Sequence, residues 1–390
     1  MKRDIAQQLE GYQDVMQLVN AAEILGEDFR SEKGAVAAYL QRIHPSRLSL
    51  RVNHIEEKTP STKTFRMTAE DGVLPPFQAG QYIALHVEVD GIRTNRPLSI
   101  ASSPSQTGYY DLTVKRVPGG LVSNYLLDTL QVGDRLTSSA PDGGFVYNPL
   151  LHGQQLVFIA GGSGITPFMS MIRDVSDRGL LDRHITLLYG NRTEDDIIYH
   201  KDLTDLAARL VNFTYVPVIE QPGPGYDGEK GFMAGDLIAR VAGDLNEAMF
   251  YLCGPSGMYD FCLAELQARK IAPRRIRREM FGPPVHVSQC PGWPADIGED
   301  NSFSVSIVDG PTITARAGTP LLNTFEQAGL APPSQCRSGE CSMCRVRILG
   351  GRVFQPAGVP LRHSDHQQGY VHCCVSYPIE DVEVLIEALR

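Results

Sequence analysis

Four cysteines near the end of the chain limit its possible folds more than any other feature. Cys336, Cys341 and Cys344 follow a C-x4-C-x2-C spacing, and 29 residues separate Cys344 from Cys374. This spacing is typical of four thiolates that hold a [2Fe–2S] cluster, with three of them on one tight loop. Gly339 suits a loop that wraps closely around an inorganic core, because glycine adopts positive φ angles freely. The pattern predicts a one-electron carrier.

The fourth ligand and the metal are not fixed by spacing alone. Cys373 and Cys374 are adjacent, and either thiol reaches the loop by spacing. A structural zinc ion is the alternative to the cluster, although its ligand gaps are usually shorter than C-x4-C. The segment Gly369–Cys374 resembles the corresponding part of plant-type ferredoxins, and this resemblance implies Cys374 as the ligand.

The composition restricts the class of protein. A length of 390 residues suggests several domains, and a formal net charge of −9 argues against a nucleic-acid partner. The apolar stretch Leu156–Ile172 contains three glycines and a proline, so it predicts a strand, turn and helix and not a membrane span. The start of the chain lacks a secretory apolar core, and the cysteine pattern suits a reducing compartment, so we expect a cytoplasmic protein.

Residues 1–45 are predicted to form a helical N-terminal arm. Apolar residues from Ile5 to Val19 recur at helical spacing, and a second helix is expected from about Ser31 to Arg42. An apolar helix face usually buries against something. The arm therefore predicts packing or homo-oligomer formation, and docking of a partner is the alternative.

Residues 46–150 are predicted to form an antiparallel barrel, because short β-rich runs alternate with turns. The barrel contains Arg96-Pro97-Leu98-Ser99, and the later segment Gly120–Ser123, which includes Val122, is expected to open a helix. An arginine and a helix N-terminus with a serine hydroxyl suit a pyrophosphate group.

These elements resemble the R-x-Y-S and G-x-x-S/T motifs of the ferredoxin–NADP reductase superfamily. The resemblance implies FAD, with Arg96 on its pyrophosphate, Ser99 near flavin N5, and the Gly120–Ser123 segment at the phosphates. Leu98 stands where the family has a tyrosine, so the ring is covered without aromatic stacking.

Residues 151–282 alternate strands and helices, which predicts a doubly wound parallel sheet. The strand ends should lie at one edge, where ligands of such folds bind. The order of the turns resembles the nicotinamide-binding domain of the same superfamily. The resemblance implies that Thr166 and Cys253 flank the nicotinamide ring. The glycines expected to let the nucleotide approach are Gly162, Gly164 and Gly254.

The choice between NADH and NADPH depends on the end of the third strand. Glu220 and Gln221 lie there, and a carboxylate would repel a 2′-phosphate, so NADH is favoured. Arg192 leaves NADPH open. The pattern Glu279-x-Phe281 resembles the domain end of ferredoxin-fused reductases, where this strand lies close to the flavin.

Residues 283–300 are rich in proline and predict a linker, and residues 301–390 predict a β-grasp-like ferredoxin domain. The three modules imply that NADH gives electrons to FAD, which passes them through the [2Fe–2S] cluster to a protein acceptor. The family suggests an oxygenase or another redox protein. A regulatory or assembly subunit with little turnover, and a reductase of small molecules at the flavin, are the alternatives.

Overall fold

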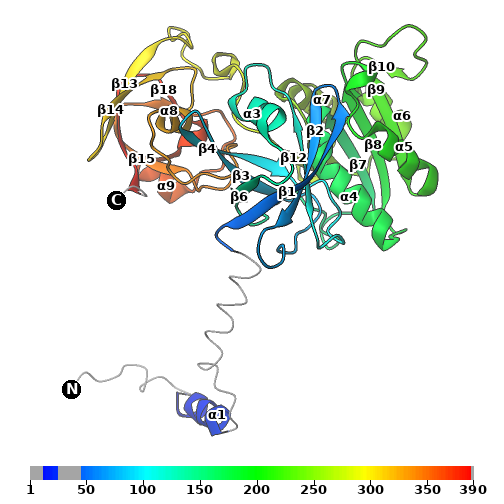
Figure 1. Ribbon diagram of the computed structural model, residues 1–390, viewed down its shortest axis with the longest axis horizontal. Helices are drawn as coiled ribbons and strands as arrows, with labels where there is room; N and C mark the ends of the chain where they lie inside the picture. Colours follow the sequence, from blue (N-terminus) through cyan, green and yellow to red (C-terminus); the bar gives the residue numbers. More distant parts are fainter. Residues whose placement is uncertain (1–11, 25–44, 388–390) are drawn as a thin grey trace. The chain divides into compact units, whose positions relative to one another are not determined.

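The computed structural model describes residues 12–24 and 45–387, and the chain divides into two units at Ser46 (Figure 1). The first unit contains helix α1 (Tyr12–Ile24), on which Val15 and Val19 are exposed. The helix expected from Ser31 to Arg42 lies outside the described residues, so the role of the N-terminal arm stays a prediction. No helix in the described ranges is both long and apolar enough to cross a membrane.

The second unit begins with an antiparallel sheet of six strands in the order β4-β3-β6-β1-β2-β5. Alternate residues of β1 are buried, and Leu50 and Val52 pack in the core with Ile83 of β3. A bridge between Ile100 and Leu112 links the two edges of the sheet and partly closes the barrel. The elements are β1 (Leu48–Thr59), β2 (Thr62–Ala69), β3 (Tyr82–Val89), β4 (Ile92–Ser99), β5 (Tyr110–Lys115), α3 (Leu121–Thr129) and β6 (Arg135–Ser138).

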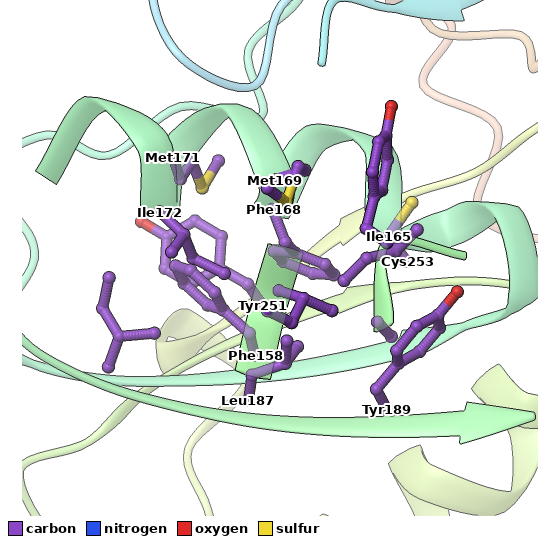
Figure 2. Packing of buried hydrophobic residues seen from close by; sticks show 14 of the residues in the cluster. Phe158, Ile165, Phe168, Met169, Met171, Ile172, Leu187, Tyr189, Tyr251 and Cys253 are labelled. Carbon is purple, nitrogen blue, oxygen red and sulfur yellow. The ribbon is translucent and has the colours of Figure 1, made fainter. Parts of the chain in front are cut away.

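A parallel sheet follows, in the order β10-β9-β8-β7-β11-β12, so the strand order reverses at β7. In β7, Phe158 and Val157 belong to cores on opposite faces, as expected for a strand covered by helices on both sides. Figure 2 shows the first core, where Phe168 stacks on Phe158 with ring centroids 4.7 Å apart. The strands are β7 (Gln155–Gly161), β8 (His184–Asn191), β9 (Phe213–Ile219), β10 (Glu229–Lys230), β11 (Met249–Cys253) and β12 (Ile276–Glu279), and the helices are α4 (Ile165–Arg178), α5 (His200–Arg209), α6 (Gly235–Ala242) and α7 (Ser256–Ala268).

The C-terminal part is a mixed sheet in the order β14-β13-β19-β15-β17, beside the pair β16 and β18. Leu321, Leu322 and Phe325 anchor helix α8 in its core. The predicted fold class of barrel, parallel sheet and ferredoxin-like domain is confirmed for these three parts. The last elements are β13 (Ser302–Ile307), β14 (Thr312–Arg316), α8 (Leu321–Gln327), β15 (Arg345–Gly350), β16 (Val353–Phe354), α9 (His363–Gln367), β17 (Tyr370–His372), β18 (Tyr377–Pro378) and β19 (Val382–Leu385).

Candidate active site

The loop between α8 and β15, here called the cysteine loop, carries Cys336, Cys341 and Cys344. The fourth predicted ligand, Cys374, follows β17. Hydrogen bonds from the thiols of Cys341 and Cys374 lower the pKa of Cys336. Hydrogen bonds from Cys373 and Cys374 lower the pKa of Cys344 to about 4. Cys374 therefore lies beside both ends of the loop, at Cys336 and Cys344, whereas Cys373 contacts Cys344.

The donor set fits a cluster of two iron atoms, because four thiols at this spacing are present and Cys374 lies beside both Cys336 and Cys344. Zinc requires four ligands around one point at about 2.0–2.3 Å, whereas a two-iron cluster divides its four thiolates between two atoms. The backbone N–H groups of Ser338, Glu340 and Cys341 also donate to Cys336 Sγ at 3.5, 3.3 and 3.4 Å, which favours a thiolate.

The backbone of this loop is unusual at three positions. Arg337, Gly339 and Ser342 have positive φ angles of 55°, 83° and 59°. A Cβ atom at Gly339 would lie 2.9 Å from Val375 Cγ2, so both the angle and the space favour glycine. Arg337 donates to the two carboxylate oxygens of Glu326 at 2.6 and 2.9 Å, and these buried bonds fix its conformation.

Strand β4 leaves two polar groups ready for a ligand, the half-buried Arg96 and the buried Ser99. The guanidinium of Arg96 donates to Thr94 Oγ1 at 2.8 Å and to the Asn95 carbonyl at 2.6 Å, and both acceptors are uncharged. Burial, together with the charge of Arg337, lowers the pKa of Arg96 to about 10. Ser99 Oγ is buried and has no hydrogen-bond partner among the described residues. These features fit FAD, whose diphosphate supplies negative charge and whose ring supplies hydrogen-bonding atoms.

The other residues of the flavin motifs lie close to the barrel core. Leu98 is half-buried and packs against that core. Gly120 precedes α3, and the Ser123 hydroxyl accepts the Val117 N–H at 3.1 Å. Val122 is only 2% exposed within the barrel core. Its backbone, and not its side chain, is therefore the part that can meet a phosphate.

The ends of β7 and β11 meet at the edge where the strand order reverses. A Cβ atom at Gly164 would lie 2.0 Å from the Cys253 carbonyl oxygen, and one at Gly254 would lie 3.0 Å from the Gly161 nitrogen. Gly162 has a positive φ of 51°. Glycine is required here because the two turns pack backbone against backbone. The edge therefore offers backbone surface that a nucleotide can approach closely.

Thr166 and Cys253 lie at this edge, but their polar groups are already occupied. Thr166 is 4% exposed and donates to the Ser163 carbonyl at 3.0 Å. Cys253 is fully buried, and burial raises the pKa of its thiol. These side chains can shape the walls of a site, and neither is placed as an acid or base.

A cleft of about 1700 Å³ connects this edge with the cysteine loop. Its walls include Gly162, Gly254 and Phe281 from the nucleotide-binding part, Tyr82 from the barrel and Cys341 from the cysteine loop. The cleft therefore joins two glycines predicted to admit the nucleotide to a predicted cluster ligand, whereas Thr166 and Cys253 do not line it. The four residues of the Arg96–Ser99 motif do not line it.

Two acidic residues of the cleft were not predicted as site residues. Glu279 is 7% exposed, and burial raises its pKa to about 8, with further contributions from Glu340 and Cys336. Burial also raises the pKa of Glu340. A neutral carboxyl group can donate a hydrogen bond as well as accept one. The Glu279-x-Phe281 pattern was the feature of the sequence that could have identified Glu279 as a site residue.

Comparison with known proteins gives matches to three families in order along the chain. Residues 49–147 match the oxidoreductase FAD-binding domain, residues 158–263 the oxidoreductase NAD-binding domain, and residues 306–378 the 2Fe-2S iron-sulfur cluster binding domain. The chain thus contains the modules of an NAD(P)H-dependent oxidoreductase with FAD and a [2Fe–2S] cluster.

Relatives named as reductase parts of monooxygenase systems are also found. The glycine betaine monooxygenase reductase subunit of Pseudomonas aeruginosa (strain UCBPP-PA14) is 29% identical over 343 residues, which cover 84% of this chain and 92% of the relative. The phenol 2-monooxygenase reductase component DmpP of Pseudomonas sp. (strain CF600) is 38% identical over 208 residues, which cover 53% of this chain and 58% of the relative. The structure of phthalate dioxygenase reductase shares the fold, with a TM-score of 0.62 at 23% identity, over 87% of this chain and 97% of that chain. The chain therefore combines an oxidoreductase FAD-binding domain, an oxidoreductase NAD-binding domain and a C-terminal 2Fe-2S iron-sulfur cluster binding domain, in the order that the resemblance to the ferredoxin–NADP reductase superfamily implied.

Proposed function

We propose that this chain oxidises NADH and delivers the electrons, through FAD and the [2Fe–2S] cluster, to an oxygenase component. The observation that carries the proposal is the cleft in which Gly162 and Gly254 share a wall with Cys341. This arrangement supports a route from the nicotinamide site to the cluster within one chain. Two relatives are named as reductase parts of monooxygenase systems, which supports an oxygenase as the acceptor.

We also propose the domain boundaries expected from the sequence. The FAD-binding barrel is residues 46–150, the nucleotide-binding domain is residues 151–282, and the ferredoxin-like domain is residues 301–390, after a linker at 283–300. The three family matches fall inside these ranges, which supports them.

The bound cofactors supply hydride exchange between nicotinamide and flavin and single-electron exchange at the cluster. The protein binds and orients them. Arg96 would hold the flavin diphosphate, and the free Ser99 hydroxyl would hydrogen-bond the ring. Thr166 and Cys253 would pack behind the glycine backbone that lines the nicotinamide site, where the neutral, buried thiol adds no charge.

The four thiolates of the cluster would come from Cys336, Cys341, Cys344 and Cys374. Cys341 is the half-buried member of this set and lines the cleft, so it is the ligand that faces the nucleotide side. The N–H groups that donate to Cys336 Sγ would stabilise the negative charge of the bound ligand set.

The first test is an anaerobic titration of the purified holoprotein with NADH. We expect the visible absorbance of both flavin and cluster to bleach, because the chain holds both centres on one route. A protein that binds all cofactors but is not bleached would contradict the proposal and favour a regulatory or assembly role. If the protein reduces its acceptor equally fast with and without the cluster, the result would favour the alternative in which small molecules are reduced at the flavin.

Nucleotide preference gives a second prediction. Glu220 and Arg192 are exposed, and Arg192 Nε donates to Gln221 Oε1 at 3.3 Å, so this cation is already engaged. The Glu220→Gln variant should raise kcat/KM for NADPH by roughly 5-fold relative to NADH, since exposed charges at about 4 Å interact by about 1 kcal/mol. The matched control is Glu229→Gln, a carboxylate on β10 that does not line the cleft. A wild-type preference for NADPH would overturn the assignment of NADH.

A further inference from the structure

The segment that leads into the cysteine loop is fastened to the barrel by hydrogen bonds. Asn95 Nδ2 donates to the carbonyl and to Oγ of Ser334 at 2.6 and 2.8 Å. Gln335 Nε2 donates to Asp142 Oδ2 at 2.8 Å. Asn95 is 3% exposed, so its bonds are shielded from water. The ferredoxin-like domain is therefore attached at β4, the strand that also carries the Arg96–Ser99 motif.

Thr94 contacts both the expected FAD site, through Arg96, and the cysteine loop, through Arg337. Its hydroxyl oxygen accepts a hydrogen bond from Arg96 Nη1 at 2.8 Å and another from Arg337 Nη1 at 3.2 Å. A hydroxyl oxygen has two lone pairs, so both bonds can form together. Thr94 is 8% exposed and Arg337 is 5% exposed, which makes the loss of either bond costly. One side chain thus links the residue beside Cys336 to the expected diphosphate anchor.

The charges around Thr94 make this link sensitive to a ligand. Arg337 is paired with the buried carboxylate of Glu326, which only partly offsets the effect of the Arg337 charge on Arg96. Arg96 has only uncharged acceptors, and its charge is close enough to Arg337 to be disfavoured by it. An anionic group at Arg96 would offset that repulsion. Binding at Arg96 and docking of the cysteine loop should therefore favour each other, because such coupling is reciprocal.

We propose that Thr94 is a positioning residue that couples FAD binding at Arg96 to docking of the cysteine loop on β4. The loop then stays attached to the barrel while electrons pass from one centre to the other. This inference rests on the proposed function for its electron-transfer part, whereas the coupling itself concerns binding and docking only.

The test compares Thr94→Val, which removes the hydroxyl at constant shape, with Thr94→Ser, which keeps it. The matched control is Thr113→Val, because Thr113 is also a buried barrel threonine but bonds to Thr64 and Tyr199 on another side. Three quantities are measured on the full-length protein. They are the dissociation constant of FAD, the amide exchange of residues 334–344 with and without FAD, and the rates of flavin and cluster bleaching after mixing with NADH.

We expect Thr94→Val to weaken FAD binding by roughly 10-fold, as loss of a hydrogen bond to a charged group implies. FAD should protect residues 334–344 from exchange in the wild type and in Thr94→Ser, but not in Thr94→Val. At saturating FAD, cluster bleaching should slow by roughly 10-fold or more relative to flavin bleaching, because the loop is misplaced.

Two results would overturn the inference. One is a Thr94→Val protein that matches Thr113→Val in all three measurements. The other is equal impairment of Thr94→Val and Thr94→Ser, which would mean that the methyl group and not the hydroxyl matters. Amide exchange measures the coupling between FAD binding and docking of the cysteine loop, and this measurement does not require that NADH reduces the protein. Failure of the proposed function is therefore distinguishable from failure of this inference.

Discussion

The Cys374→Ser variant is expected to lose the [2Fe–2S] cluster and keep its flavin. Cys374 lies beside both Cys336 and Cys344, so its removal opens the ligand set at the point where the two ends of the loop meet. The rate of electron transfer to a protein acceptor should fall by roughly 100-fold or more, because changing a residue outside the ligand set of a metal site already costs about 10–100-fold. The variant should still reduce ferricyanide with NADH, because ferricyanide can accept electrons directly from the flavin.

The neighbouring cysteine supplies the control for this experiment. Cys373 is fully buried and contacts Cys344. Cys373→Ser should keep the iron, the sulfide and the visible spectrum of the wild type. Iron and sulfide analysis and absorption spectra of both variants show which of the two cysteines is the fourth ligand. A colourless Cys373→Ser protein beside a coloured Cys374→Ser protein would show that the fourth ligand is misassigned.

Features that depend on local chain geometry could be predicted from the sequence. The glycine turn at Gly161–Gly164 and the one at Gly254 follow buried strands, and the structure packs these two turns against each other. Gly339 was expected where the cysteine loop bends, and its φ is 83°. These positions are readable because the close approaches at Gly164, Gly254 and Gly339 leave no room for a side chain, whatever the rest of the fold does.

Features that depend on long-range packing could not be predicted in this way. Thr94 and Arg337 are 243 residues apart in the chain, and nothing near either residue signals their contact. Val122 fits the spacing of the phosphate motif, yet helix periodicity turns its side chain into the barrel core. The raised pKa of Glu279 arises from burial at the meeting point of separate parts of the chain. Spacing specifies which residues are available, and tertiary packing decides what each one contacts.

The ion pair between Arg337 and Glu326 should make a large contribution to the stability of the ferredoxin-like domain. The two side chains are 6% and 7% exposed and share two hydrogen bonds at 2.6 and 2.9 Å. Replacing Arg337 with methionine leaves a buried carboxylate without its partner. Such a change costs about 3–5 kcal/mol of unfolding free energy. The double variant Arg337→Met/Glu326→Leu should recover most of this loss, because it removes both charges.

The single tryptophan of the chain makes this loss measurable in one domain. Trp293 packs edge-to-face on Phe354, with ring centroids 5.2 Å apart, so its fluorescence reports on the ferredoxin-like part during unfolding in urea. The control is Arg352→Met, which breaks an exposed pair with Glu380 in the same domain and should shift the unfolding curve far less, because exposed ion pairs contribute little. A shift for Arg337→Met no larger than that of the control would contradict the prediction. The buried pair would then not be a main source of the rigidity that holds Cys336 in place.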